Sequence, residues 1–103
     1  MMLLTMIYNS CESICNKYPE WKSDIRVIVI CTLLSNPLLC EQSYSMISEW
    51  IEDHMKKECV FSYDGLQKIQ NSLLQICTDY YSKENYSLCA IVMSYIFFFI
   101  IVV

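Results

Sequence analysis

The sequence predicts an all-α protein in which four amphipathic helices, bundled or stacked, precede a very apolar C-terminal helix. The chain of 103 residues has one glycine and two prolines, which leaves little material for the tight turns of β-hairpins. Apolar residues recur at helical spacing in four successive segments. The last 18 residues carry no charge. We therefore divide the chain into a helical domain, residues 1–85, and an apolar C-terminal helix, residues 86–103.

The first two helices flank Pro19. The first is expected from about residue 3 to residue 17, with its apolar side formed by Leu3, Leu4, Ile7, Tyr8, Cys11, Ile14, Cys15 and Tyr18. Pro19 ends it, and Ser23 or Asp24 is expected to cap a second helix that runs to Ser35. Residues 25–34 are β-branched and apolar nearly all round, so a buried strand is the alternative. A helix is favoured because no other segment offers a strand to pair with.

The next two helices follow the break at Asn36-Pro37. The third is expected from about residue 38 to Lys57, with one face formed by Leu39, Ser43, Met46, Ile47, Trp50, Ile51, His54 and Met55. After a link through Cys59, Ser62 or Asp64 is expected to cap the fourth helix. Seven apolar residues of these two helices are the candidate interaction faces: Ile47, Trp50, Ile51, Leu66, Ile69, Leu73 and Ile76.

The C-terminal segment has two interpretations. As a helix its 18 residues would be about 27 Å long, near the lower limit for crossing a bilayer, so it either spans a membrane or packs in a helical core. Its length, its lack of charge and its tyrosines slightly favour the membrane. The residues that would face lipid or core are Leu88, Ile91, Val92, Tyr95, Ile96, Phe97, Phe98, Phe99, Ile100 and Ile101.

A recurrence 62 residues apart supports the core interpretation. Residues 7–18 and 69–80 are identical at six of twelve positions. Each copy is followed by a short polar link and then an apolar run, so the C-terminal segment takes the place of the second helix. This pattern is typical of stacked helical units. Chance agreement between two amphipathic helices of similar composition is the alternative.

The residue content argues against catalysis, metal binding and cofactor binding. A structural zinc site usually needs paired close spacings such as C-x-x-C, which this chain lacks. A nucleophilic cysteine needs a base, and the single histidine, His54, is expected to be a solvated residue at a helix end. The net charge of −4 and the scattered basic residues argue against nucleic acid. Seven cysteines without a convincing signal peptide favour a reducing, intracellular setting.

These observations predict a non-enzymatic helical module that binds another protein, with a membrane as an alternative partner for the C-terminus. One alternative is a fragment or short form of a longer helical-repeat scaffold. The layout of a helical bundle followed by an apolar C-terminal segment also resembles apoptosis regulators of the Bcl-2 type, some of which occur in large viruses. That resemblance implies a membrane-associated regulator, although the Asn-Trp-Gly-Arg motif of cellular members is absent.

Overall fold

The structure, a computed structural model, describes the backbone of residues 2–56 and 60–101 and their side chains except that of Ile101. Lys57 at the predicted end of the third helix, the link residue Cys59, and the last two tail residues lie outside the described residues. The elements are α1 (Met2–Lys17), the short 3-10 helix η1 (Pro19–Trp21), α2 (Lys22–Ser35), α3 (Tyr44–Lys56), α4 (Tyr63–Ser82) and α5 (Tyr86–Ile101). The described part of the chain contains no strand, so the predicted all-α class is confirmed.

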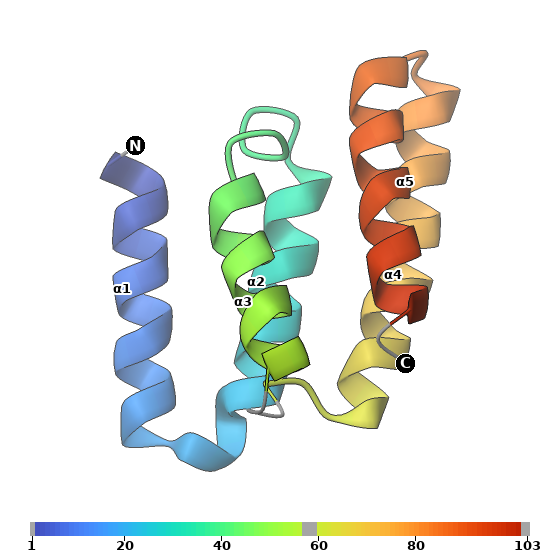
Figure 1. Cartoon of the computed structure of the whole chain (residues 1–103). Coiled ribbons are helices and arrows are strands. Elements are labelled where there is room, and N and C mark those ends of the chain that lie inside the picture. Colours follow the sequence, from blue (N-terminus) through green and yellow to red (C-terminus); the bar gives the residue numbers. More distant parts are fainter. Residues whose placement is uncertain (1, 57–59, 102–103) are drawn as a thin grey trace.

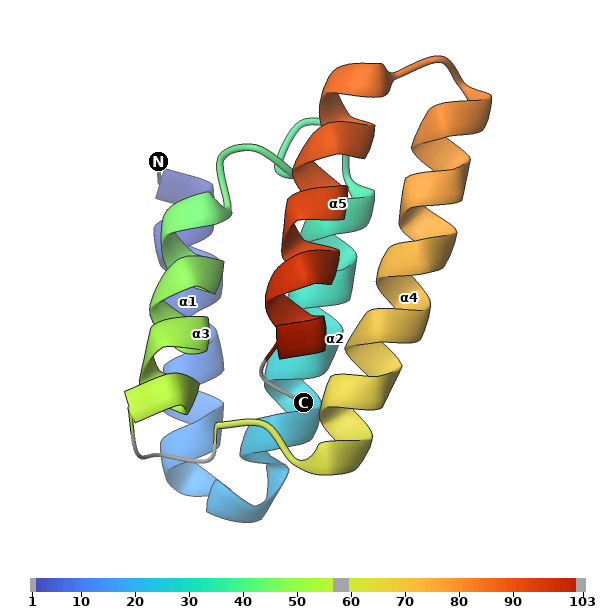
Figure 2. The same ribbon diagram turned by 45° about the vertical axis from the view of Figure 1, so that its right-hand side comes forward.

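The five α-helices form two layers. Successive helices run in opposite directions, and α1, α2 and α4 make one layer on which α3 and α5 pack from the same side (Figures 1 and 2). The Cα atoms extend over 41 × 32 × 18 Å, and the thin dimension fits two helix layers. The core between them contains the largest fully buried side chains: Trp50, Tyr95, Phe99, Ile30, Leu33, Leu34, Ile47, Ile69 and Leu73.

The β-branched segment 25–34 lies within α2 rather than in a strand. It buries Arg26, Val27, Ile30, Leu33 and Leu34, and tertiary burial of this kind overrides the weak β-preference of branched residues. The helix is central because α1 and α4 flank it in its own layer (Figure 1). The choice of helix from the sequence is therefore confirmed.

The predicted caps are confirmed for α4 and wrong for α2. Ser62 caps α4, because its Oγ accepts a hydrogen bond from the Gly65 N–H at 3.0 Å. The N-terminus of α2 has no side-chain cap, so neither Ser23 nor Asp24 has the expected role. Ser23 Oγ instead accepts a hydrogen bond from the Ser62 N–H at 2.9 Å. The start of α2 is thus joined to the start of α4.

The third helix begins later than predicted, at Tyr44 instead of about residue 38. The Asn36 side chain accepts a hydrogen bond from the Leu38 N–H at 2.9 Å, and its carbonyl accepts from the Cys40 N–H. These local bonds hold the segment after Asn36 in turns, as short polar side chains often do. Met55, predicted on the same face as Ile47 and Trp50, is exposed.

The single glycine of the chain serves a helix contact rather than a turn. A Cβ atom at Gly65 would lie 2.7 Å from Ser23 Oγ and 3.2 Å from Val27 Cγ2. Since real Cβ contacts are rarely that short, the missing side chain lets α4 approach α2 closely at this point.

Both copies of the recurring sequence belong to antiparallel helix pairs, α1 with α2 and α4 with α5 (Figure 1). Their environments differ. Ile76 in the second copy is buried, whereas its equivalent in the first copy, Ile14, is exposed. The first helix of the first pair buries Cys11 and Cys15, while α4 buries six residues. The α1–α2 pair therefore leaves apolar side chains exposed at positions whose equivalents in the α4–α5 pair are buried.

Candidate interaction surfaces

The candidate interaction residues predicted on the third and fourth helices are all part of the core. The exposed fraction of each side chain lies between 0 and 8 per cent. These residues are Ile47, Trp50, Ile51, Leu66, Ile69, Leu73 and Ile76. They pack α3 and α4 into the chain's own bundle, so in this fold none of them is free to contact a partner. A partner surface has to consist of other residues.

The C-terminal helix has a buried face and an exposed face. The buried residues are Leu88, Cys89, Val92, Tyr95 and Phe99, and the half-buried residues Ile91 and Ile96 pack beside them. Phe97, Phe98 and Ile100 are exposed, and the side chain of Ile101 lies outside the description. Of the tail residues predicted to face lipid or core, about half are therefore in the core of this structure. No helix within the described residues has the length and apolar character needed to cross a membrane.

An exposed apolar groove lies between α1 and α2. It has a volume of about 440 Å³, and its lining residues are Leu3, Met6, Ile7, Ser10, Cys11, Ile14, Ile25, Ile28 and Val29. Among the described residues no charged side chain lines it. Four large apolar side chains in the groove are exposed to solvent, with exposed fractions of 50, 59, 41 and 61 per cent for Leu3, Met6, Ile14 and Ile28.

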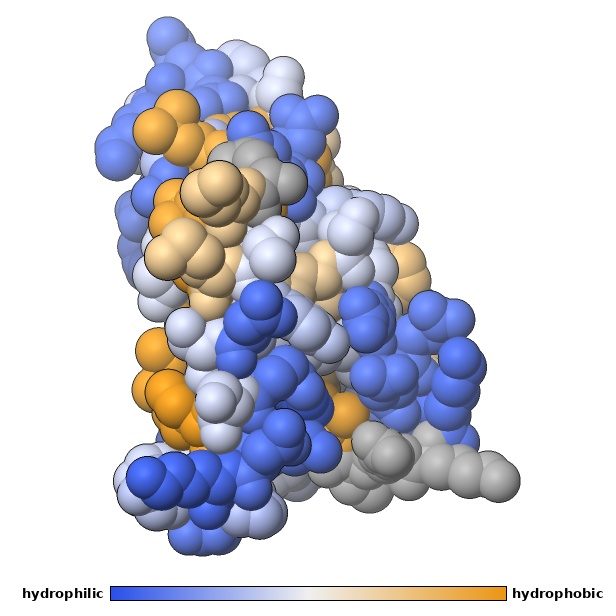
Figure 3. Space-filling view, turned by 90° about the vertical axis from the view of Figure 1, so that its left-hand side faces the viewer, coloured by the Kyte–Doolittle hydropathy of each residue, from blue (hydrophilic) through white to orange (hydrophobic). Residues whose placement is uncertain are grey.

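The view onto the α1 side shows how this apolar surface is placed. Hydrophobic residues gather toward the left-hand edge in Figure 3, and the right-hand edge is mainly hydrophilic. From Leu3 to Ile14 the α1 side of the groove extends over roughly 16 Å, about three helical turns. The dimensions suit a short helix packed against both α1 and α2.

The width of the apolar stripe on α1 is a sequence signal for this groove. The predicted apolar stripe of α1 is wide, because it includes both the pair Leu4 and Tyr8 and the pair Leu3 and Ile14. A single neighbouring helix covers only part of so wide a stripe. In the structure, Leu4 and Tyr8 face α3, and Leu3 and Ile14 line the groove.

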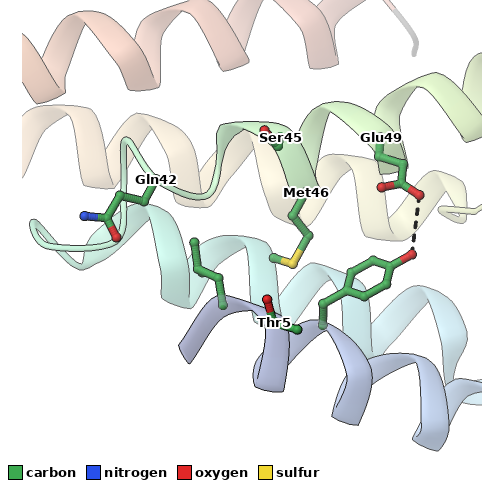
Figure 4. A pocket seen from close by; sticks show the side chains of 7 residues that line it. Thr5, Gln42, Ser45, Met46 and Glu49 are labelled. Atoms are coloured by element: carbon green, nitrogen blue, oxygen red, sulfur yellow. Dashed lines mark hydrogen bonds between the residues drawn. The ribbon is translucent and has the colours of Figure 1, made fainter. Parts of the chain in front are cut away.

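A second, more polar pocket of about 730 Å³ lies between α1 and α3 (Figure 4). Its lining residues are Leu4, Thr5, Tyr8, Gln42, Ser45, Met46 and Glu49. The Tyr8 hydroxyl donates a long hydrogen bond of 3.4 Å to Glu49 Oε1. Burial and the nearby carboxylates of Glu12 and Glu49 raise the pKa of Tyr8, so the phenol is a hydrogen-bond donor at neutral pH and not a base.

A buried arginine lies beneath α1. The Arg26 side chain is 4 per cent exposed, and its Nη2 lies 2.8 Å from Oε1 of Glu12, which is 29 per cent exposed. The guanidinium carbon lies 5.2 Å from the centre of the Trp50 ring. Among the described residues, Arg26 Nε and Nη1 and Trp50 Nε1 have no hydrogen-bond partner. The ion pair attaches α1 to α2, and its polar groups are only partly satisfied.

His54 and the cysteines, for which the sequence predicts no catalytic role, have the following surroundings. His54 is half-buried, and its Nδ1 accepts a hydrogen bond from the Phe61 N–H at 3.3 Å. Burial raises the pKa of Cys11 to about 12, the opposite of what a catalytic thiolate at neutral pH requires. Within the described residues, no three His, Cys, Asp or Glu side chains are grouped so that they could hold a metal ion.

The tryptophans also have distinct positions. Trp50 is fully buried, while Trp21 is exposed and stacks on Tyr18 with ring centres 4.1 Å apart.

Comparison with protein-family models, with curated proteins and with solved structures gives no match.

Proposed function

We propose that this chain is a non-enzymatic protein–protein interaction module whose α1–α2 groove binds an amphipathic helix of a partner protein. The observation that supports the proposal is the groove itself, in which four large apolar side chains are about half exposed and no described lining residue is charged. Contiguous apolar surface of this kind is expensive to leave in water and commonly marks an interaction site.

The fold itself supplies the argument for a helix as occupant. On the other side of the same layer, α3 and α5 cover the layer formed by α1, α2 and α4 (Figure 2). A partner helix on the open side of α1 and α2 would repeat this arrangement. The partner would present apolar residues at positions i, i+3 or i+4, and i+7, the spacing that enters grooves of this type. Three acidic and three basic residues in segment 2–35 leave the α1–α2 pair without net charge, so apolar contact would provide most of the affinity.

The test uses fluorescein-labelled synthetic helices with a leucine stripe at that spacing, measured by fluorescence anisotropy. We expect groove-dependent binding that Met6→Glu and Ile28→Glu each weaken at least tenfold, because a carboxylate would be buried among apolar side chains. Leu74→Glu is the matched control, since Leu74 is similarly exposed but lies on α4, outside the groove. Circular dichroism establishes that all three variants remain folded.

Three outcomes would contradict the proposal. Equal binding by the wild-type chain and both groove variants would show that the peptide binds elsewhere. Loss of a concentration-dependent dimer in the groove variants, measured by light scattering, would make a second copy the occupant. Loss of flotation with neutral phosphatidylcholine vesicles in the same variants would make it a lipid surface.

Membrane association through α5 is a second proposal with its own supporting observation. The outer face of α5 exposes Met93, Phe97, Phe98 and Ile100, and no charged residue lies between 85 and 103. Vesicle flotation of Phe97→Glu distinguishes this face from the groove, because only a lipid-binding α5 would lose flotation through that substitution. The repeat-scaffold interpretation remains a further proposal, supported by the two helix pairs.

A further inference from the structure

Two cysteines face each other across the α4–α5 pair. Cys77 lies in the last third of α4 and Cys89 at the start of α5, and their Sγ atoms are 3.2 Å apart. Neither cysteine is in a disulfide in this structure. Cys77 is half-buried and Cys89 is 8 per cent exposed, so solvent reaches Cys77 more readily.

The turn between the helices holds the two thiols in this position. Asn85 N–H donates to the Tyr80 carbonyl at 2.8 Å, and Glu84 N–H donates to the Tyr81 carbonyl at 3.0 Å. The Cys89 N–H in turn donates to the Asn85 carbonyl at 3.0 Å. A disulfide requires a sulfur–sulfur distance of about 2.05 Å, so the sulfurs would move together by about 1 Å, within the reach of a small side-chain rotation.

The other described cysteines lack this combination of proximity and access. Cys11 and Cys15 are each 3 per cent exposed and lie on the same helix. Cys40 is fully buried. Cys31 is half-buried, and the group beside its thiol is Ser72.

We propose that Cys77 and Cys89 form a dithiol site that reacts with small-molecule disulfides, such as oxidised glutathione, to give an intramolecular disulfide joining α4 to α5. The Cys77 thiolate attacks one sulfur of the small disulfide, which releases one small thiol and leaves a mixed disulfide on Cys77. The Cys89 thiolate then attacks the Cys77 sulfur and releases the second small thiol. The protein loses two electrons and two protons, and one small disulfide becomes two thiols.

The proposed bond has two measurable consequences. It closes a loop of 12 residues between α4 and α5, which restricts the unfolded chain and is expected to raise the Tm by roughly 10 °C or more. Burial and the adjacent Cys89 thiol raise the pKa of Cys77 to about 11. Since the thiolate is the reactive form, the reaction is expected to accelerate nearly tenfold per pH unit between about pH 7 and 9.

The experiment treats the full chain carrying Cys59→Ser with oxidised and reduced glutathione at several ratios. After acid quenching and alkylation with N-ethylmaleimide, intact mass should fall by two alkyl groups and 2 Da relative to the fully reduced, fully alkylated protein. Trypsin cuts after Lys68 and Lys83, so the disulfide should link peptides 69–83 and 84–103. The Tm of the oxidised protein should exceed that of the reduced protein.

Cys77→Ser is the matched control, and it should show neither the linked peptides nor the rise in Tm. Absence of the linked peptides at every glutathione ratio would overturn the proposal. So would a stable mixed disulfide on Cys77 that Cys89 does not resolve, or an oxidised form with a lower Tm than the reduced form. None of these results depends on whether the α1–α2 groove binds a partner.

Discussion

The Glu12–Arg26 ion pair gives the sharpest test of how α1 is held, through the substitution Glu12→Gln. In the wild-type chain, the guanidinium donates to Glu12 at 2.8 Å and lies over the Trp50 ring. Within the described residues, Nε and Nη1 of Arg26 already lack acceptors. Removing the carboxylate charge therefore leaves a buried cation with little compensation.

The size of the effect follows from the burial of the two groups. Breaking a buried ion pair by removing one partner costs about 3–5 kcal/mol. Because the Glu12 side chain is 29 per cent exposed, water compensates part of the loss, and we expect about 2–3 kcal/mol. Arg26→Met removes the charge together with both unsatisfied N–H groups and keeps an apolar stem, so it should change stability by less than about 1 kcal/mol.

The assay is urea unfolding of the two single variants and the double variant, followed by circular dichroism. We expect the double variant to be more stable than Glu12→Gln alone, with a coupling free energy of about 2 kcal/mol. Glu49→Gln is the control and should change stability by less than about 0.5 kcal/mol, because Glu49 is exposed and its bond to Tyr8 is long. A loss of stability below about 0.5 kcal/mol for Glu12→Gln would refute the reasoning. So would a loss for Arg26→Met that exceeds the loss for Glu12→Gln.

Three further predictions concern buried hydroxyls and the single glycine. Tyr95→Phe should leave stability unchanged or raise it by up to about 1 kcal/mol, since no described residue accepts a hydrogen bond from its buried hydroxyl. Tyr80→Phe should cost about 1–2 kcal/mol, because the Tyr80 hydroxyl donates to the Leu34 carbonyl at 2.6 Å. Equal losses of stability for the two variants in urea titrations would contradict this expectation. Burial raises the pKa of Tyr80 to about 12, so the folded state keeps a proton that the unfolded state releases near pH 10. Stability should fall by about 2 kcal/mol between these values, and less steeply in Tyr80→Phe. Gly65→Ala should lower the Tm despite the higher helix propensity of alanine, because the new Cβ would lie 2.7 Å from Ser23 Oγ. A raised Tm would show that the Ser23 hydroxyl moves aside at no cost.

Helical spacing and chain breakers were sufficient to predict the fold class and most helix boundaries. Pro19 and the Ser62 cap mark helix ends through local chemistry, which a sequence displays directly. The late start of α3 could not be read in the same way. It depends on hydrogen bonds that Asn36 accepts from the following backbone N–H groups, and these compete with a helix whose side chains fit the periodicity equally well.

The partner surface was harder to predict because periodicity identifies apolar faces without saying which of them the chain covers itself. Trp50 and Ile69 have the spacing of an interaction face, but both are fully buried by other helices of this chain. Arg26 was hidden inside an apolar run, and its role follows from Glu12 and Trp50, which lie on two other helices. Contacts of this kind are set by the packing of the layers.

The exposed apolar residues follow from the arrangement of the two layers. The layer of α3 and α5 packs on one side of the layer of α1, α2 and α4, so the opposite side of that layer stays uncovered (Figure 1). The chain is 55 per cent hydrophobic by composition, and a domain of this size buries only about 60–65 per cent of its unfolded surface. Apolar residues therefore remain outside, and in this structure Met6 and Ile28 gather in a concave groove while Phe97 and Ile100 lie on a convex helix face. An incoming helix can contact both α1 and α2 in the groove, whereas the outer face of α5 offers it the residues of one helix, which is why the groove is the stronger candidate for binding a partner.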